Sequence, residues 1–139
     1  MKKLLLLSIS LLTLSFVSNS FAHDLKGAIA SEDRTPKNVV RDVYRNPYET
    51  LDFFGIKQDM TVVELSPGGG WYTEILANYI HYPGTLIAAH FNPDAGGYYK
   101  RGRANFEKKM NSNPMYGRVE IVNIDSTLAE PNSVDAVLT

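Results

Sequence analysis

The chain has 139 residues, with 14 Lys and Arg against 15 Asp and Glu, a net charge of −1, and no cysteine. This charge balance gives no electrostatic reason to expect binding to nucleic acid or to an anionic membrane. Without cysteine a disulfide framework is excluded, so the hydrophobic core alone must stabilise the fold.

The first 22 residues are typical of a secretory signal peptide. Lys2 and Lys3 precede an apolar run over residues 4–17, and residues 20–22 (Ser-Phe-Ala) offer small side chains for cleavage. The run is shorter than the roughly 20 residues of a membrane span. We therefore expect export, to the periplasm or out of the cell, without a stable membrane anchor. Cleavage would leave about 117 residues, the size of one domain.

Two helices are expected before the first strand, after a mobile lead-in over residues 23–34. Thr35 and Pro36 are typical of an N-cap followed by proline at the first helical position. The apolar face of this first helix would consist of Val39, Val40, Val43 and Tyr44.

The second helix is expected to begin at Pro47, with Asn46 as its cap and Glu49 completing a capping box. Leu51 and Phe54 would supply its buried side. Gly55 would end it, because glycine readily adopts the left-handed conformation that follows many helices.

Strand-like and helix-like segments then alternate. Strand patterns cover residues 61–63, 85–89, 119–124 and 135–139, whereas helix patterns begin at Trp71 and cover residues 98–110. The second of these helices carries five Lys and Arg residues and is expected to present a solvated face. The alternation predicts an α/β fold with a mainly parallel sheet.

The segment after the first strand has the features of a nucleotide-type binding site. Glu64 stands where the strand leaves the sheet, and the turn that follows contains Ser66, Gly68, Gly69 and Gly70. Glycine permits positive φ and lets a ligand approach the backbone closely. The helix that begins at Trp71 would add the unpaired N–H groups of its first turn.

Other nucleotide sites fit this turn less well. A dinucleotide fingerprint requires G-x-G-x-x-G or a final alanine, but the pattern that starts at Gly68 ends at Thr73. A phosphate loop requires Gly-Lys followed by Ser or Thr, which is absent. The sequence also contains no cluster with metal-ligand spacing, so no metal is expected.

These residues resemble the class I S-adenosylmethionine-dependent methyltransferases, and more narrowly the exported predicted methyltransferases with a Pro-Gly-Gly-Gly-Trp-Tyr turn. Glu64, Gly68 and Gly70 fall on the family's acid and glycine positions, and Ser66 stands where the first glycine usually lies. Asp125 falls where the family places an acid that accepts from the adenine amino group. The resemblance implies a Rossmann-like sheet and S-adenosylmethionine as the small-molecule cofactor.

His90 departs from the family pattern, because the second strand should end in an acid that accepts from the ribose hydroxyls. A neutral imidazole can still accept one hydrogen bond. Each site residue also has a structural alternative. Glu64 can cap the next helix, Asp125 can be a turn residue, and His90 can be a histidine satisfied within the protein.

Two functions follow from the resemblance. One is an exported enzyme that transfers a methyl group from S-adenosylmethionine, and the other is a non-catalytic exported binding domain of the same fold. Family members continue beyond a fourth strand, so residues 35–139 are interpreted as the N-terminal part of such a domain, truncated after that strand and not expected to turn over alone. The sequence identifies neither the methyl acceptor, nor catalytic residues, nor an oligomeric state.

Overall fold

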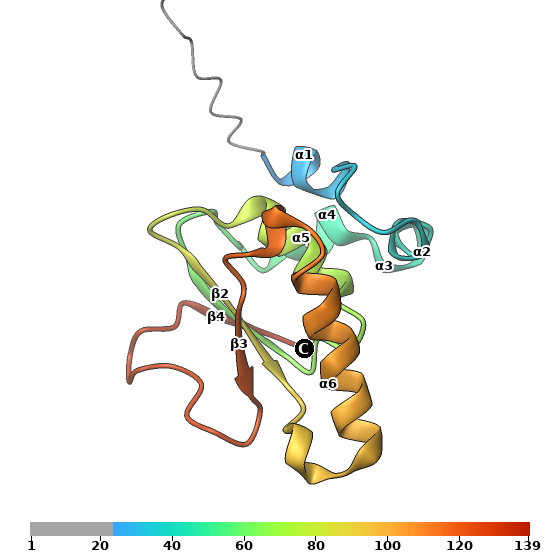
Figure 1. Cartoon of the computed structure of the whole chain (residues 1–139). Coiled ribbons are helices and arrows are strands. Elements are labelled where there is room, and N and C mark those ends of the chain that lie inside the picture. Colours follow the sequence, from blue (N-terminus) through green and yellow to red (C-terminus); the bar gives the residue numbers. More distant parts are fainter. Residues whose placement is uncertain (1–23) are drawn as a thin grey trace, which may run out of the picture.

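A four-stranded parallel sheet forms the centre of the computed structural model, which describes residues 24–139 (Figure 1). The strands are β1 (Thr61–Leu65), β2 (Thr85–His90), β3 (Glu120–Asn123) and β4 (Ala136–Leu138), in the spatial order β3-β2-β1-β4. The α/β fold predicted from the sequence is therefore confirmed. The order 3-2-1-4 is also that of the first four strands of a Rossmann sheet.

The two central strands are buried on both faces. Val62 and Val63 of β1 lie beside Leu86 and Ile87 of β2 in parallel register, and all four side chains are buried. Near-continuous apolar runs of this kind are what a parallel sheet requires, because helices or loops cover both of its faces. The edge strands β3 and β4 are shorter and more exposed than the central pair.

Helices α5 (Trp71–Tyr79) and α6 (Gly97–Met110) cover one face of the sheet. Ile75 and Leu76 of α5 and Phe106 of α6 pack there against the side chains of β1 and β2. The opposite face is covered by the connection between β3 and β4, which packs its Leu128, Ala129 and Val134 against Val63, Ile87 and Ala89. Two short 3-10 turns, η1 (Pro93–Ala95) and η2 (Pro114–Tyr116), flank α6.

Four short helices precede the sheet: α1 (Leu25–Ile29), α2 (Pro36–Val39), α3 (Asp42–Arg45) and α4 (Pro47–Phe53). Helix α1 lies inside the stretch that the sequence predicts to be a mobile lead-in. It forms because Asp24 caps it, with its side chain accepting from the Gly27 N–H at 2.7 Å, and because Leu25 and Ala28 are buried.

The sequence-based prediction for the next segment is wrong about which side is buried. One helix was expected, but α2 and α3 are separate, and the supposed core face is exposed: Val39 42 %, Val40 67 %, Val43 72 % and Tyr44 85 %. The polar side chains of the same segment turn inward instead, because they bind buried groups near the glycine turn. In α4, Leu51 is buried as expected, but Phe54 lies beyond the helix and is 57 % exposed.

The helix caps also differ from expectation. Thr35 and Asn46 make no capping hydrogen bond with their side chains, although Pro36 and Pro47 do begin α2 and α4. Asn46 has φ 44°, which joins α3 to α4 through a left-handed residue. The side chain of Thr35 is used elsewhere, in the network described below.

Within residues 24–139 no helix combines the length and apolar character needed to cross a membrane. The same residues contain no group of three or more His, Asp or Glu side chains arranged to hold a metal ion. The signal peptide expected over residues 1–22 lies outside the described residues.

Candidate functional site

The glycine turn connects β1 to α5 through residues in left-handed conformations. Ser66, Gly68 and Gly70 have φ values of 53°, 58° and 78°. Glycine adopts such values without strain, whereas a left-handed residue with a side chain costs roughly 1 kcal/mol or more. The glycines at 68 and 70 are thus explained by backbone geometry. Ser66 retains some strain at the position where the methyltransferase family usually has glycine.

Gly69 differs from the glycines on either side of it. Its φ lies outside the left-handed region, and a Cβ added there would meet no atom within 4 Å. A Cβ on Gly70, in contrast, would lie 3.2 Å from the ring of Phe106. Backbone geometry and packing therefore do not explain the glycine at 69, and the open space beside it is free for a ligand.

The carbonyl groups of the three glycines are each held by a side chain from a different element. His90 at the end of β2 contacts the Gly68 carbonyl through Nε2 at 3.2 Å. Lys109 of α6 donates to the Gly69 carbonyl at 2.6 Å, and Asn38 of α2 donates a longer bond of 3.5 Å to the Gly70 carbonyl. The turn is consequently fixed from three directions through these carbonyls.

A buried carboxylate links this arrangement to the N-terminal helices. Glu74 of α5 is fully buried and accepts from both the N–H and the hydroxyl of Thr35, at 3.2 and 2.7 Å. It also forms an ion pair with Lys109, whose side chain is only 14 % exposed. This lysine belongs to the helix face that was expected to be solvated, so that expectation is wrong at this position.

A second polar cluster anchors α3 against the same turn. Asp42 pairs with the buried guanidinium of Arg34 through two hydrogen bonds of 2.6 and 2.8 Å. The indole N–H of Trp71 lies 3.0 Å from both an Asp42 oxygen and the Asn38 carbonyl. Arg45 lies over the indole ring, 4.8 Å from its centroid. Trp71 is therefore a buried anchor for the N-terminal segment.

Glu64 lies at the end of β1, as predicted, and is almost completely buried. Its Oε2 accepts from the Thr73 hydroxyl at 2.6 Å. Burial raises the pKa of Glu64 to about 7, against the opposing effects of the hydrogen bonds from Thr73 and the charge of Lys109. The carboxyl group can therefore exchange a proton near neutral pH and hold a nearby cation once it is ionised.

His90 is buried, and both of its ring nitrogens are used within the chain. Nδ1 accepts from the Phe91 N–H at 2.7 Å, while Nε2 faces the Gly68 carbonyl. Because an amide N–H only donates and a carbonyl only accepts, these contacts assign the proton to Nε2. Desolvation lowers the pKa of His90, which favours this neutral form. In this arrangement neither nitrogen is left to accept from a ribose hydroxyl.

Asp125 follows β3 and is exposed. One of its carboxylate oxygens accepts from the Asn92 side chain at 3.0 Å, which ties the loop after β3 to the loop after β2. Asp125 lines neither of the two cavities beside the glycine turn. The structure thus brings together Glu64, the turn and His90, and leaves Asp125 at the margin.

Two cavities flank the turn, one on each side. The first has a volume of about 300 Å³ and is lined by Glu64, Ser66, Gly68 and Gly69, by Arg41, Arg45 and Tyr72, and by Thr139 after β4. It lies between the carboxyl ends of β1 and β4, where the strand order reverses. This reversal is the switch point at which open α/β sheets bind their ligands.

The second cavity has a volume of about 530 Å³ and lies between the turn and α6. Gly68 and Gly69 form one wall, Lys109 contributes a cation, and Phe91 and Tyr98 contribute aromatic rings. Phe91 also contacts Tyr98 and Tyr99 ring to ring, with centroids 6.2 and 5.0 Å apart. Cationic and aromatic groups beside an open backbone suit a ligand that has both a polar part and a flat ring.

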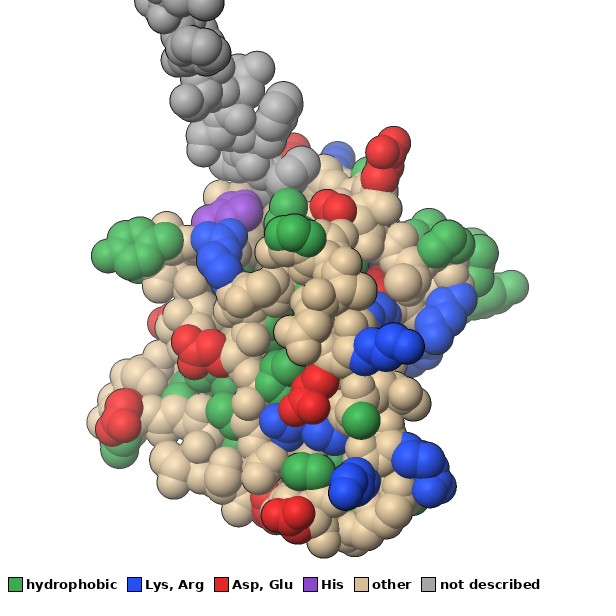
Figure 2. Space-filling model, viewed as in Figure 1, with side chains coloured by type: hydrophobic (Ala, Val, Ile, Leu, Met, Phe, Trp, Pro, Cys, Tyr) green, Lys and Arg blue, Asp and Glu red, His purple; other side chains and the backbone are tan. Residues whose placement is uncertain are grey.

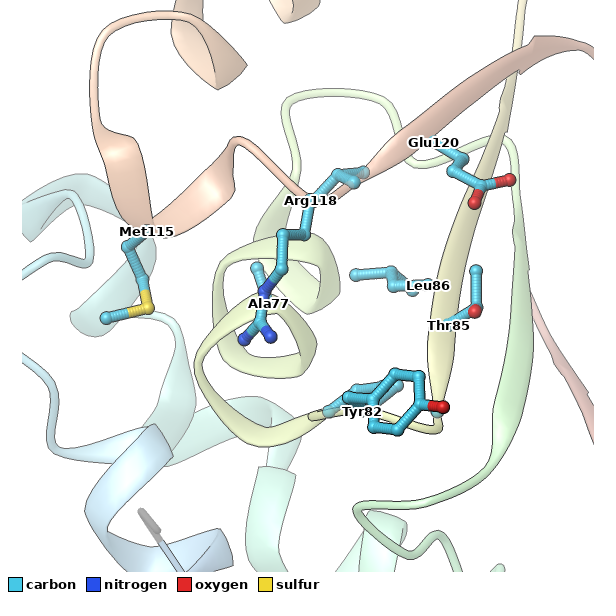
Figure 3. Close-up of a pocket in the computed structure, with 10 residues that line it drawn as sticks. Ala77, Tyr82, Thr85, Leu86, Met115, Arg118 and Glu120 are labelled. Atoms are coloured by element: carbon cyan, nitrogen blue, oxygen red, sulfur yellow. The ribbon is translucent and has the colours of Figure 1, made fainter. Parts of the chain in front are cut away.

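A third cavity lies at the opposite end of the sheet, beside the first residues of β2 and β3. Figure 3 shows Arg118 extending across it, between Met115 and Leu86. Its volume is about 290 Å³. Because parallel sheets bind ligands at their carboxyl ends, this cavity is not part of the candidate site.

Several site residues were not predicted from the sequence: Thr35, Asn38, Arg41, Arg45, Phe91, Tyr98 and Lys109. For most of them no local signal exists, since they come from elements that precede or follow the turn by tens of residues. The polar residues at 35, 38 and 42 do recur at helical spacing. That recurrence could have indicated an inward polar face.

The strand order, the cavity at the switch point and the glycine turn before α5 are features that this chain shares with nucleotide-binding α/β folds. A scan of protein-family models finds no match, and a search of curated proteins also finds none. The chain is similar to the crystal structure of a cyclopropane-fatty-acyl-phospholipid synthase-like protein from Lactobacillus casei, with a TM-score of 0.45 and 14% identity. The match covers 73% of this chain and 38% of that protein.

Proposed function

We propose that this chain is the cofactor-binding part of an S-adenosylmethionine-dependent methyltransferase that acts outside the cytoplasm. The observation that carries the proposal is the turn at Gly68 and Gly69, which is fixed through its carbonyls and open to cavities on both sides. A turn built in this way is preorganised to accept an elongated ligand across the carboxyl ends of the strands.

The residues around the turn fit the two ends of such a cofactor. Glu64 borders the cavity at the switch point, where its ionised carboxylate would attract the ammonium of the amino acid end. Phe91 and Tyr98 line the cavity on the other side, where aromatic rings would pack against a base. When bound, the cofactor would supply a methyl group on a positively charged sulfur. An acceptor would attack the methyl carbon in line with the carbon–sulfur bond, and the sulfur would leave as a neutral thioether. The protein contributes mainly by positioning the two reactants.

The alternative is a binding domain of the same fold without catalytic activity. The hydrogen bonds of His90 favour this alternative, because they leave the end of β2 without an acceptor for the ribose. Export follows from the signal peptide expected over residues 1–22.

A graded series at Gly69 tests the proposed site. Gly69→Ala and Gly69→Leu add side chains into open space, so both variants should melt within a few degrees of the parent. Calorimetric titration with S-adenosylhomocysteine should show binding to the parent, weaker binding to Gly69→Ala, and none to Gly69→Leu. Equal affinity across the series, or no binding by the parent, would refute the proposed function.

A further inference from the structure

The segment that contains α2 and α3 has its polar and apolar sides reversed relative to an ordinary surface helix. Thr35, Asn38 and Asp42 point inward and bind Glu74, the Gly70 carbonyl and Arg34. The apolar side chains of the segment point outward. A surface segment of a monomeric protein normally buries its apolar side, so an exposed cluster of this kind marks an interaction surface.

We define the α2–α3 face as four apolar and three cationic side chains: Val39, Val40, Val43 and Tyr44, with Lys37, Arg41 and Arg45. Figure 2 shows hydrophobic side chains with Lys and Arg beside them over α2 and α3, at the right of the view. The one acid within the segment, Asp42, is neutralised by the buried Arg34. The exposed charges of this face are therefore all positive, although the whole chain has a net charge of −1.

We propose that the α2–α3 face docks on an anionic lipid surface. Valine and tyrosine side chains can enter the boundary between headgroups and acyl chains, while lysine and arginine reach the phosphates from the same depth. Each cation near an anionic membrane contributes about a fivefold gain in binding. A second copy of the chain is a poorer occupant, because a two-fold contact would place the same cations against each other.

The segment is already folded before it meets the lipid, since its inward side chains bind the Gly70 carbonyl and two side chains of α5. Docking would therefore require little ordering of the backbone, which favours binding. Arg41 and Arg45 also line the cavity at the switch point. A docked chain would consequently hold the mouth of that cavity next to the lipid headgroups. The inference rests on the surface alone and stands independently of the proposed function.

Two exposed tyrosines provide a matched test. Tyr44 belongs to the α2–α3 face and is 85 % exposed, whereas Tyr82 lies at the amino end of the sheet and is 92 % exposed. Sedimentation should be measured with vesicles of phosphatidylglycerol and phosphatidylcholine, and with phosphatidylcholine alone. Residues 1–23 are shared by the parent and both variants, so ratios between these proteins report on the substituted side chain.

The parent should bind the anionic vesicles at least tenfold more tightly than the neutral ones, and added salt should weaken this binding. Tyr44→Ser should weaken it about tenfold, the effect of partly burying one aromatic side chain. Tyr82→Ser should leave it unchanged.

Three results would overturn the proposal. The first is equal binding to both vesicle types, the second is an equal loss in the two variants, and the third is no effect of Tyr44→Ser. Light scattering without lipid tests whether a second copy of the chain occupies the face instead. A dimer of the parent that Tyr44→Ser dissociates would show that the face is a contact between copies. Thermal melts should show that both variants fold as the parent does.

Discussion

Replacing Glu64 by glutamine should remove a pH-dependent destabilisation of the folded protein. Burial raises the pKa of this carboxyl group from its ordinary value of 4.5 to about 7. The folded state then binds a proton more tightly than the unfolded state does. The resulting stabilisation is fully present below pH 4.5 and is lost as the pH rises through about 7.

The size of the effect follows from the same two pKa values. Each pKa unit corresponds to about 1.4 kcal/mol. The change from 4.5 to about 7 thus corresponds to about 3 kcal/mol in the free energy of unfolding. Most of this, about 2–3 kcal/mol, falls between pH 5 and pH 8. Glutamine cannot ionise, and its carbonyl can still accept from the Thr73 hydroxyl. Its amide N–H groups, however, are buried without water, which lowers the free energy of unfolding by about 1–3 kcal/mol at every pH.

The informative quantity is therefore how the difference in stability between Glu64→Gln and the parent changes with pH. Urea unfolding, followed by the fluorescence of Trp71, the single tryptophan, should be measured from pH 5 to pH 8. The difference should shift in favour of the variant by about 2–3 kcal/mol over this range. Glu49→Gln serves as the control, because that side chain is exposed and should give a much smaller change. A difference that stays constant with pH would refute the reasoning.

Further predictions concern the turn and its supports. Gly70→Ala should lower the free energy of unfolding by about 1–3 kcal/mol, because φ is 78° and the new Cβ would lie 3.2 Å from the Phe106 ring. Gly69→Ala should change it by less than about 0.5 kcal/mol, so similar losses for the two variants in urea unfolding would contradict this prediction. Lys109→Met should cost about 3–5 kcal/mol by leaving Glu74 buried without its cation, and adding Glu74→Gln should restore part of the loss in thermal melts. Ser66→Gly should be tolerated, while Ser66→Val should cost more than about 1 kcal/mol, because a branched side chain opposes a φ of 53°. Affinity for S-adenosylhomocysteine should rise as the pH increases through about 7, and calorimetry should find that Glu64→Gln removes this dependence.

The sequence determined the parts of the fold that depend on local pattern. The apolar strands, the turn at residues 66–70 and the start of α5 at Trp71 all lie where the sequence predicts them. Glu64 also lies near the end of β1 as predicted, because it directly follows the β-branched residues of the strand and precedes the glycine turn. Local sequence carries this information because strand pairing and helix formation select residue types over short stretches.

Tertiary structure decided which side chains hold the turn and which side of each segment is buried. Lys109 and Asn38 reach the glycine carbonyls from helices that are distant in sequence. The ion pair with the buried Glu74 leaves the Lys109 side chain only 14 % exposed. The valines of α2 and α3 were expected in the core, but buried polar partners hold the opposite side of that segment inward. Periodicity alone cannot choose between these two sides. The partners of the inward polar groups are distant in sequence, and their hydrogen bonds and ion pairs form only once the fold has brought them together. Those interactions then outweigh the burial of a few apolar side chains.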